Sequence, residues 1–128
     1  MPVKKIIECK NAPAPIGPYS QAIIFDKFIF TSGQIAIDPL SNQVIQDDIE
    51  KQTIQVLDNL RLILKEAGSS FDSVIKTTIY LKDMKDFPEV NKIYEKSFKN
   101  SKPARSTVEV SNLPKNVRIE IDCIAHLV

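Results

Sequence analysis

Two charged side chains near the C-terminus, Arg105 and Glu120, have the types and spacing to face one pocket. The chain carries fourteen lysines but only three arginines, and two of these, Arg105 and Arg118, lie within residues 103–121. Lysine supplies most of the positive charge, whereas the planar guanidinium of arginine can form two parallel hydrogen bonds to an anion. Arg105 therefore favours a site that binds an anionic group in a fixed orientation.

The segment that contains these two side chains predicts two strands joined by a polar loop. Over 117–125 the odd positions are apolar and the even positions begin with charged residues, the alternation of a strand with one buried face. In an antiparallel hairpin with Val110 opposite Val117, every apolar residue falls on one face. The pairs expected on the polar face, away from the helices, are Glu109 with Arg118, Thr107 with Glu120, and Arg105 with Asp122. The alternative interpretation is a solvated strand face with weak ion pairs.

Hydrophobic periodicity predicts two helices and six strands. The helix at 47–67 would be capped by Asp47 or Asp48 and end near Gly68, and the second helix would be capped by Asp86. The expected helices are 47–67 and 87–98, and the expected strands are 6–9, 22–25, 28–37, 74–81, 105–110 and 117–125.

Two helices can cover only one face of a six-stranded sheet. The strand that begins F-I-F at 28–30 is apolar at three consecutive positions, which indicates burial on both faces. A second copy of the chain would cover the other face, so we expect a homo-oligomer.

Composition predicts one domain over residues 1–128. With 43% apolar residues and a net charge of +1, the chain should bury a core, and strong attraction to nucleic acid is not expected. Cys9 and Cys123 lack metal-ligand spacing, and the strand parity of Cys123 predicts a buried, inert thiol. We find no signal peptide, membrane span, metal motif or cofactor motif. We therefore expect a cytoplasmic protein, with an organellar location left open.

The sequence resembles the Rid family, the reactive intermediate deaminases, also called the YjgF or liver perchloric-acid-soluble protein family. The resemblance covers nearly the whole chain and is most specific at P-A-R-S. The matching motifs include I-G-P-Y-S-Q-A (16–22), T-S-G-Q-I (31–35), V-I-K-T-T-I-Y-L-K-D (74–83), V-N-K-I-Y-E (90–95), P-A-R-S (103–106) and R-I-E-I (118–121). It implies a chorismate-mutase-like (YjgF-type) α+β domain. The sheet would have six mostly antiparallel strands with two helices on one face, and the chain would form a homotrimer with sites between subunits.

In the branch that keeps the arginine, the resemblance implies a 2-iminobutanoate/2-iminopropanoate deaminase. Such an enzyme hydrolyses 2-aminoacrylate and related enamines or imines to 2-oxo acids and ammonia, and no cofactor is expected. Arg105 would bind the substrate carboxylate, and Glu120 would hold or activate the attacking water as a general base.

The resemblance also implies further contacts around the substrate. Tyr19 would come from the adjoining subunit, and Thr107 would act through its backbone. The implied substrate-binding set is Tyr19, Ser32, Gly33, Asn91, Arg105 and Thr107. Alternatives remain open from the residues alone: Tyr19 anchoring its loop, Ser32 serving as a turn hydroxyl, and Asn91 bonding to backbone. His126 ends a strand and is assigned no catalytic role.

Many family members carry Cys at the position of Thr107, so thiol-based activities are not expected here. Two other functions compete with deamination: an endoribonuclease or translation inhibitor, as some members are described, and a non-catalytic module that binds small acids. The near-neutral charge and the absence of interleaved basic and aromatic residues disfavour the nuclease.

Overall fold

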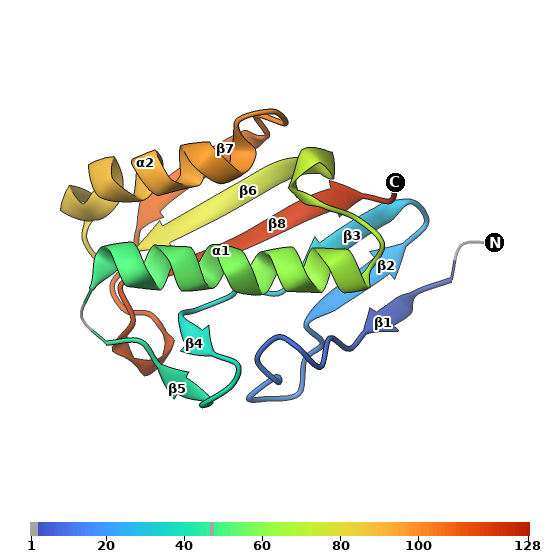
Figure 1. The fold of residues 1–128 in the computed structure, drawn as a ribbon, viewed down its shortest axis with the longest axis horizontal. Helices are drawn as coiled ribbons and strands as arrows, with labels where there is room; N and C mark the ends of the chain where they lie inside the picture. Colours follow the sequence, from blue (N-terminus) through green and yellow to red (C-terminus); the bar gives the residue numbers. More distant parts are fainter. Residues whose placement is uncertain (1–2, 47) are drawn as a thin grey trace.

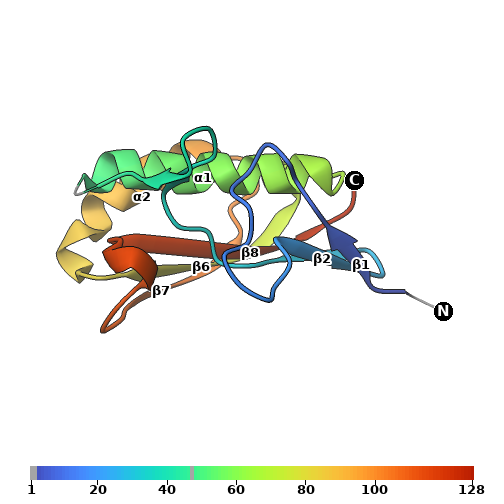
Figure 2. The same cartoon turned by 90° about the horizontal axis from the view of Figure 1, so that it is seen from below.

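The computed structural model describes residues 3–46 and 48–128 as a sheet with a helical layer on one face (Figure 1, Figure 2). The main sheet has the strand order β1-β2-β3-β8-β6-β7, and only β6 and β7 are parallel neighbours. Its strands are β1 (Lys5–Ile7), β2 (Ala22–Phe25), β3 (Phe28–Thr31), β6 (Val74–Leu81), β7 (Ala104–Glu109) and β8 (Ile119–His126). Helices α1 (Ile49–Glu66) and α2 (Phe87–Phe98) lie on the same face, which confirms the predicted α+β class.

Helix α1 forms where the apolar stripe predicts it. Its N-cap Asp48 accepts a hydrogen bond from the backbone N–H of Lys51 at 3.0 Å, which satisfies one of the free donors of the first turn. Just beyond the C-cap, Gly68 has a φ of +86°, a conformation that glycine adopts without strain. The other candidate cap, Asp47, lies outside the described residues.

Helix α2 has the predicted bounds, but Asp86 does not cap it with its side chain. The Asp86 carboxylate instead accepts hydrogen bonds from Nη2 and Nε of Arg118, at 2.6 and 3.2 Å. Asp86 is thus the N-cap residue, as predicted, but its side chain forms an ion pair instead of a capping hydrogen bond, because a two-point ion pair with a guanidinium is stronger than a bond to one backbone N–H. Arg118, the residue just before β8, is thereby tied to the start of α2. It was predicted to pair with Glu109 and pairs with Asp86 instead.

The strand predicted over 28–37 is shorter than expected. β3 ends at Thr31, and Gln34 then forms an isolated bridge to Ile121 of β8. A separate two-stranded ladder follows, β4 (Ile37–Asp38) with β5 (Gln43–Val44), which the sequence did not predict.

The two C-terminal strands do not pair with each other, so the predicted hairpin is wrong. β6 lies between them, parallel to β7 and antiparallel to β8. The cause is the β6–α2–β7 unit, in which the helix returns the chain to the start of β6 and the next strand runs parallel. The observed partners on β6 are Thr77 for Arg105, Ile79 for Thr107, Leu81 for Glu109, Tyr80 for Glu120 and Thr78 for Asp122.

Arg105 and Glu120 consequently lie on opposite faces of the sheet, contrary to the prediction. Arg105 is across from Thr77, whose hydroxyl lies 2.6 Å from that of Tyr94 on α2, so Arg105 is on the helix-covered face. Glu120 is across from Tyr80, three residues further along β6. Because side chains alternate between faces, this odd offset puts Glu120 on the face without helices.

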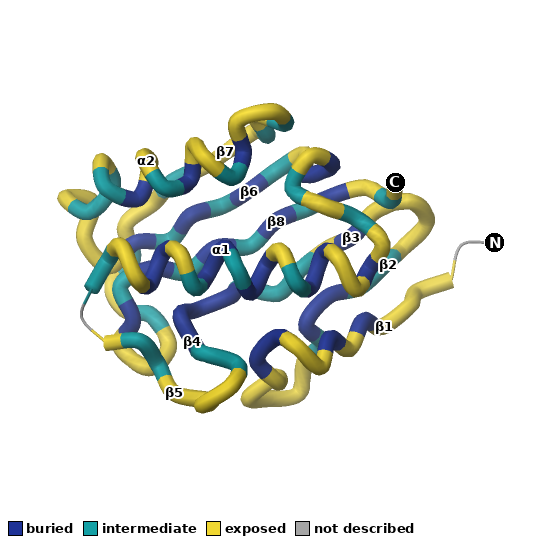
Figure 3. Tube along the Cα trace, viewed as in Figure 1, coloured by how far each residue is buried: buried dark blue, intermediate teal, exposed yellow. Residues whose placement is uncertain are grey.

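The core lies between the sheet and the two helices, which form the two layers seen in Figure 2. Figure 3 marks the buried residues of these elements in dark blue. Cys123 is buried there, and burial raises the pKa of its thiol to about 12, as expected for an inert cysteine. In the F-I-F strand Ile29 is fully buried, but Phe28 and Phe30 remain 42% and 43% exposed on the open face. Across the described residues, no helix is long and apolar enough to cross a membrane.

Candidate functional site

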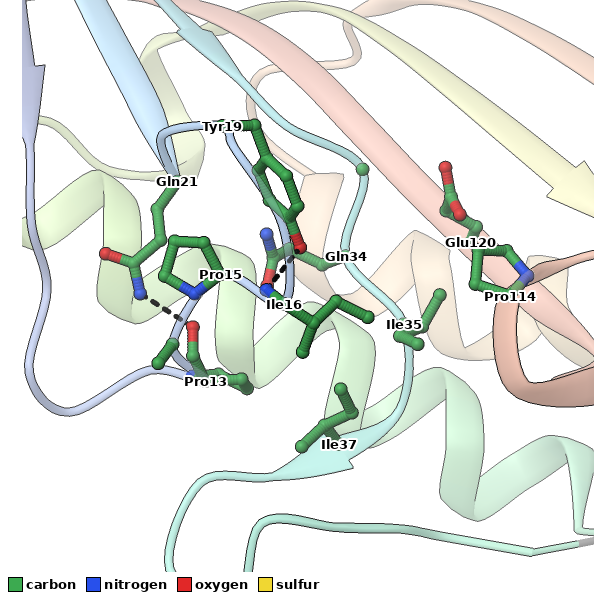
Figure 4. A pocket seen from close by; sticks show the side chains of 12 residues that line it. Pro13, Pro15, Ile16, Tyr19, Gln21, Gln34, Ile35, Ile37, Pro114 and Glu120 are labelled. Carbon is green, nitrogen blue, oxygen red and sulfur yellow. Dashed lines mark hydrogen bonds between the residues drawn. The ribbon is translucent and has the colours of Figure 1, made fainter.

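One group of predicted site residues surrounds Glu120. A pocket is formed by the Pro-rich loop before β2, the segment after β3 and the start of β8, with Tyr19 on one side and Glu120 on the other (Figure 4). Its lining residues include Pro15, Ile16, Tyr19, Gly33, Ile35, Pro114 and Glu120.

Gly33 makes room for the Glu120 carboxylate. A Cβ at position 33 would overlap Oε2 of Glu120 and lie 2.7 Å from its Cδ. The backbone at Gly33 has no positive φ, so close approach, rather than conformational freedom, is what requires glycine here. Two hydrogen bonds between the backbones of Gln34 and Ile121, at 2.8 and 3.2 Å, hold the segments together at this point.

The environment of Glu120 favours its protonated form. Burial raises the pKa of this carboxyl, and the nearby Asp122 raises it further. Within the described part of the chain, no hydrogen-bond donor or cation contacts the Glu120 carboxylate. Glu120 is therefore a stronger base than an exposed glutamate and is open to water or a ligand.

The hydroxyls of two predicted site residues, Tyr19 and Ser32, hold the loop beside this pocket. The Tyr19 hydroxyl accepts a hydrogen bond from the backbone N–H of Ile16 at 3.3 Å, and Ser32 Oγ donates to the Ser20 carbonyl at 2.5 Å. These contacts match the alternative interpretations of a loop anchor and a turn hydroxyl. The ring of Tyr19 still lines the pocket.

The second group surrounds Arg105 on the other side of the sheet. Nη1 of Arg105 donates a hydrogen bond to Oδ1 of Asn91 at 2.8 Å. Its guanidinium carbon lies 5.1 Å from the ring centroid of Phe87 and 4.9 Å from that of Tyr94. All three partners come from α2, at spacings that place them on one helix face.

Arg105 differs from the other two arginines in its partners. Arg61 pairs with Asp58 at 2.7 Å, and Arg118 pairs with Asp86 at 2.6 Å. Among the residues that the structure describes, no carboxylate lies within ion-pair distance of Arg105. Most of its N–H donors therefore remain available to an external anion.

Thr107 lies beside Arg105 on the same face of β7. Its Oγ1 is buried and has no hydrogen-bond partner among the described residues, although buried hydroxyls nearly always have one. β7 is the last strand of the sheet, so one side of its backbone is free to bond to a ligand or another chain. Both features point to a contact that a single chain does not complete.

The seven predicted site residues thus form two separate groups in one chain. Tyr19, Ser32, Gly33 and Glu120 lie on one side, and Asn91, Arg105 and Thr107 lie on the other. Sequence reasoning did not predict the contact of Phe87 and Tyr94 with Arg105. Their spacing of four and three residues from Asn91 is the signal that could have revealed it. In residues 3–46 and 48–128, no group of three His, Cys, Asp or Glu could hold a metal ion.

The fold is an α+β sandwich of one sheet and one helical layer, and its two candidate groups centre on Arg105 and Glu120. The family model described as "Endoribonuclease L-PSP" matches residues 9–127. The chain belongs to this family, which is the YjgF/Rid family that the sequence resembles.

Several relatives match along their whole length. A RutC family protein of Pyrococcus horikoshii is 54% identical over 124 residues, covering 97% of this chain and 98% of the relative. The 2-iminobutanoate/2-iminopropanoate deaminase of Mus musculus is 46% identical over 123 residues, covering 96% and 91%. The structure of TdcF from E. coli with bound serine has a TM-score of 0.91 at 38% identity and covers 97% and 99%. These likenesses confirm the YjgF-type fold.

Proposed function

We propose that this protein is an enamine/imine deaminase that hydrolyses 2-aminoacrylate-type intermediates to 2-oxo acids and ammonia. The observation that carries the proposal is Arg105, an arginine held in place by an amide and two rings instead of an acid. Such an arginine can bind a substrate carboxylate through two parallel hydrogen bonds. The mouse relative is named as an imine deaminase, and the TdcF structure contains an amino acid, which also has a carboxylate.

Glu120 supplies the base that this reaction needs. Once the enamine has tautomerised to the imine, water adds to the C=N carbon while Glu120 accepts a proton from it. Glu120 returns this proton to the nitrogen, which gives a carbinolamine, a carbon that carries both OH and NH2. It then takes the proton of the hydroxyl and passes it to the amine as the C–N bond breaks, so ammonia leaves and the 2-oxo acid remains. Its raised pKa makes Glu120 a stronger base toward the attacking water than an ordinary glutamate.

The site requires two copies of the chain, because Arg105 and Glu120 lie on opposite faces of one sheet. The Glu120 group of one subunit would meet the Arg105 group of the next. The open face offers an apolar surface for this contact, with exposed Ile6, Phe25, Phe28, Phe30 and Val108. A homotrimer, as the family resemblance implies, would bury this face and form three equivalent sites.

Replacement of Arg105 tests the proposal. Arg105→Ala should abolish ammonia release from 2-aminoacrylate generated in situ. Arg105→Lys should have little activity, because lysine keeps the charge but lacks the fork, the pair of parallel N–H donors on the planar guanidinium. Arg61→Ala is the matched control, since Arg61 is an exposed arginine paired with Asp58, and it should retain full activity. Full activity in Arg105→Ala would refute the proposal.

The family model's own description favours endoribonuclease as a second candidate. Cleavage of RNA by highly purified protein, unchanged after replacement of both Arg105 and Glu120, would reveal a separate nuclease surface. Binding of 2-oxo acids without accelerated ammonia release would instead indicate a sensor.

A further inference from the structure

Two aromatic rings hold the Arg105 guanidinium without using up its hydrogen-bonding capacity. Phe87 and Tyr94 lie seven residues apart on α2, with ring centroids 5.1 and 4.9 Å from the guanidinium carbon. A ring attracts the cation through its π face and accepts none of the N–H donors in the guanidinium plane. A carboxylate in the same place would have neutralised Arg105 and occupied its fork.

The ring of Tyr94 is itself held in position by two contacts. Its hydroxyl lies 2.6 Å from Oγ1 of Thr77, which is fully buried on the strand next to Arg105. Burial raises the pKa of Tyr94, so its hydroxyl stays protonated and the hydrogen bond persists. The ring of Phe98, 4.4 Å away between centroids, packs against Tyr94 as well.

We propose that Phe87, Tyr94 and Thr77 are positioning residues that hold the Arg105 fork ready for the substrate carboxylate. This inference rests on the proposed function, in which Arg105 binds that carboxylate. A flexible arginine loses rotamer freedom when it binds a ligand, whereas an arginine already held between two rings loses less. Removing a ring, or the hydroxyl pair that fixes one, should therefore weaken carboxylate binding while Arg105 itself remains.

The first measurement follows Arg105 directly. The chain has three arginines, so its arginine Nε–Hε signals are few in a ¹⁵N NMR spectrum, and Arg105→Lys identifies the signal of Arg105. In Thr77→Val, Tyr94→Phe and Phe87→Leu this signal should show that the Arg105 side chain has become more mobile. The matched controls are Thr53→Val, at another fully buried threonine, and Phe71→Leu, at a phenylalanine packed on Phe98; both should leave it unchanged.

The second measurement is function. In Phe87→Leu the Kd for 2-oxobutanoate and the KM for the imine should rise roughly three- to ten-fold, the range expected for loss of one cation–π contact. Tyr94→Phe and Thr77→Val keep both rings and remove only the hydroxyl pair that fixes one of them, so in these two variants both constants should rise by a smaller factor. The kcat should change less, because Glu120 on the other face is untouched. Phe87→Tyr, which keeps a ring, should restore the wild-type values.

The outcomes separate this inference from the function it rests on. An Arg105 signal as rigid in the variants as in the wild type would overturn it, and so would increased mobility with unchanged Kd and KM. Full deaminase activity in Arg105→Ala would instead remove the proposed function, and the inference with it, whatever the NMR shows. If Thr53→Val and Phe71→Leu weakened ligand and substrate binding as much as the three variants do, Phe87, Tyr94 and Thr77 would act only as ordinary core residues.

Discussion

Position 33 controls where the Glu120 carboxylate can lie. In Gly33→Ala the added methyl would occupy the space of that carboxylate, and the end of the flexible glutamate side chain would move rather than the backbone. We expect kcat/KM to fall roughly 100-fold, as for loss of a general base, with a nearly unchanged Tm. Deaminase assays and thermal unfolding of the variant check this. Wild-type activity would show that the close approach has no catalytic importance.

Glu120 is needed for activity, but at neutral pH its ionised carboxylate should lower the stability of the folded chain. Because its pKa is raised in the folded chain, the native state binds the proton more tightly than the unfolded state. Glu120 therefore favours folding while protonated, and this contribution is lost as the pH rises through the raised pKa. At neutral pH, Glu120→Gln should raise stability while it abolishes deamination.

Urea unfolding at pH 5 and pH 8, at one protein concentration, measures this effect. The gain in stability of Glu120→Gln over the wild type should be larger at pH 8. A variant that is less stable than the wild type at both pH values would contradict the assignment.

At the scale of elements, the helices and most strands could be predicted from the sequence because their signals are local. The stripe of α1 and the alternation of β8 each lie within one segment. Pairing between strands is not local: β7 and β8 are neighbours in sequence, yet each pairs with a different edge of β6. The strand–helix–strand order over 74–109 favours a parallel pair of β6 and β7, whereas the complementary charges of 105–122 favour a hairpin, and the connection through α2 decides the pairing.

The ion pair between Asp86 and Arg118 should stabilise the junction of α2 with β8. The Asp86 side chain is only 12% exposed, and the pair has two hydrogen bonds. We expect Asp86→Ala to lower the free energy of unfolding by about 2 kcal/mol, between the values for surface and buried pairs. Asp58→Ala breaks the exposed pair with Arg61 and should lower it by less than about 0.5 kcal/mol. Equal effects in urea unfolding would show that the junction is not stabilised by this pair.

At the scale of the whole molecule, the candidate residues could be named from motifs, but their grouping could not. Strand parity correctly put Glu120 opposite the buried face of β8, the scarcity of arginine indicated Arg105, and the resemblance supplied Tyr19 and Asn91. Only the insertion of β6 between β7 and β8 separates Arg105 from Glu120, and no single strand's pattern encodes that. The apolar residues left exposed on the open face agree with the prediction of a homo-oligomer, which a single chain does not test.

Mixed oligomers of two inactive variants test most directly whether one site takes residues from two chains. Arg105→Ala and Glu120→Ala, each inactive alone, are co-expressed with different tags, and the oligomers that carry both tags are purified. A closed three-fold ring containing both variants has one site with both wild-type residues, so its activity should be about one third of the wild-type value. Mixed oligomers as inactive as their parents would contradict a site shared between subunits.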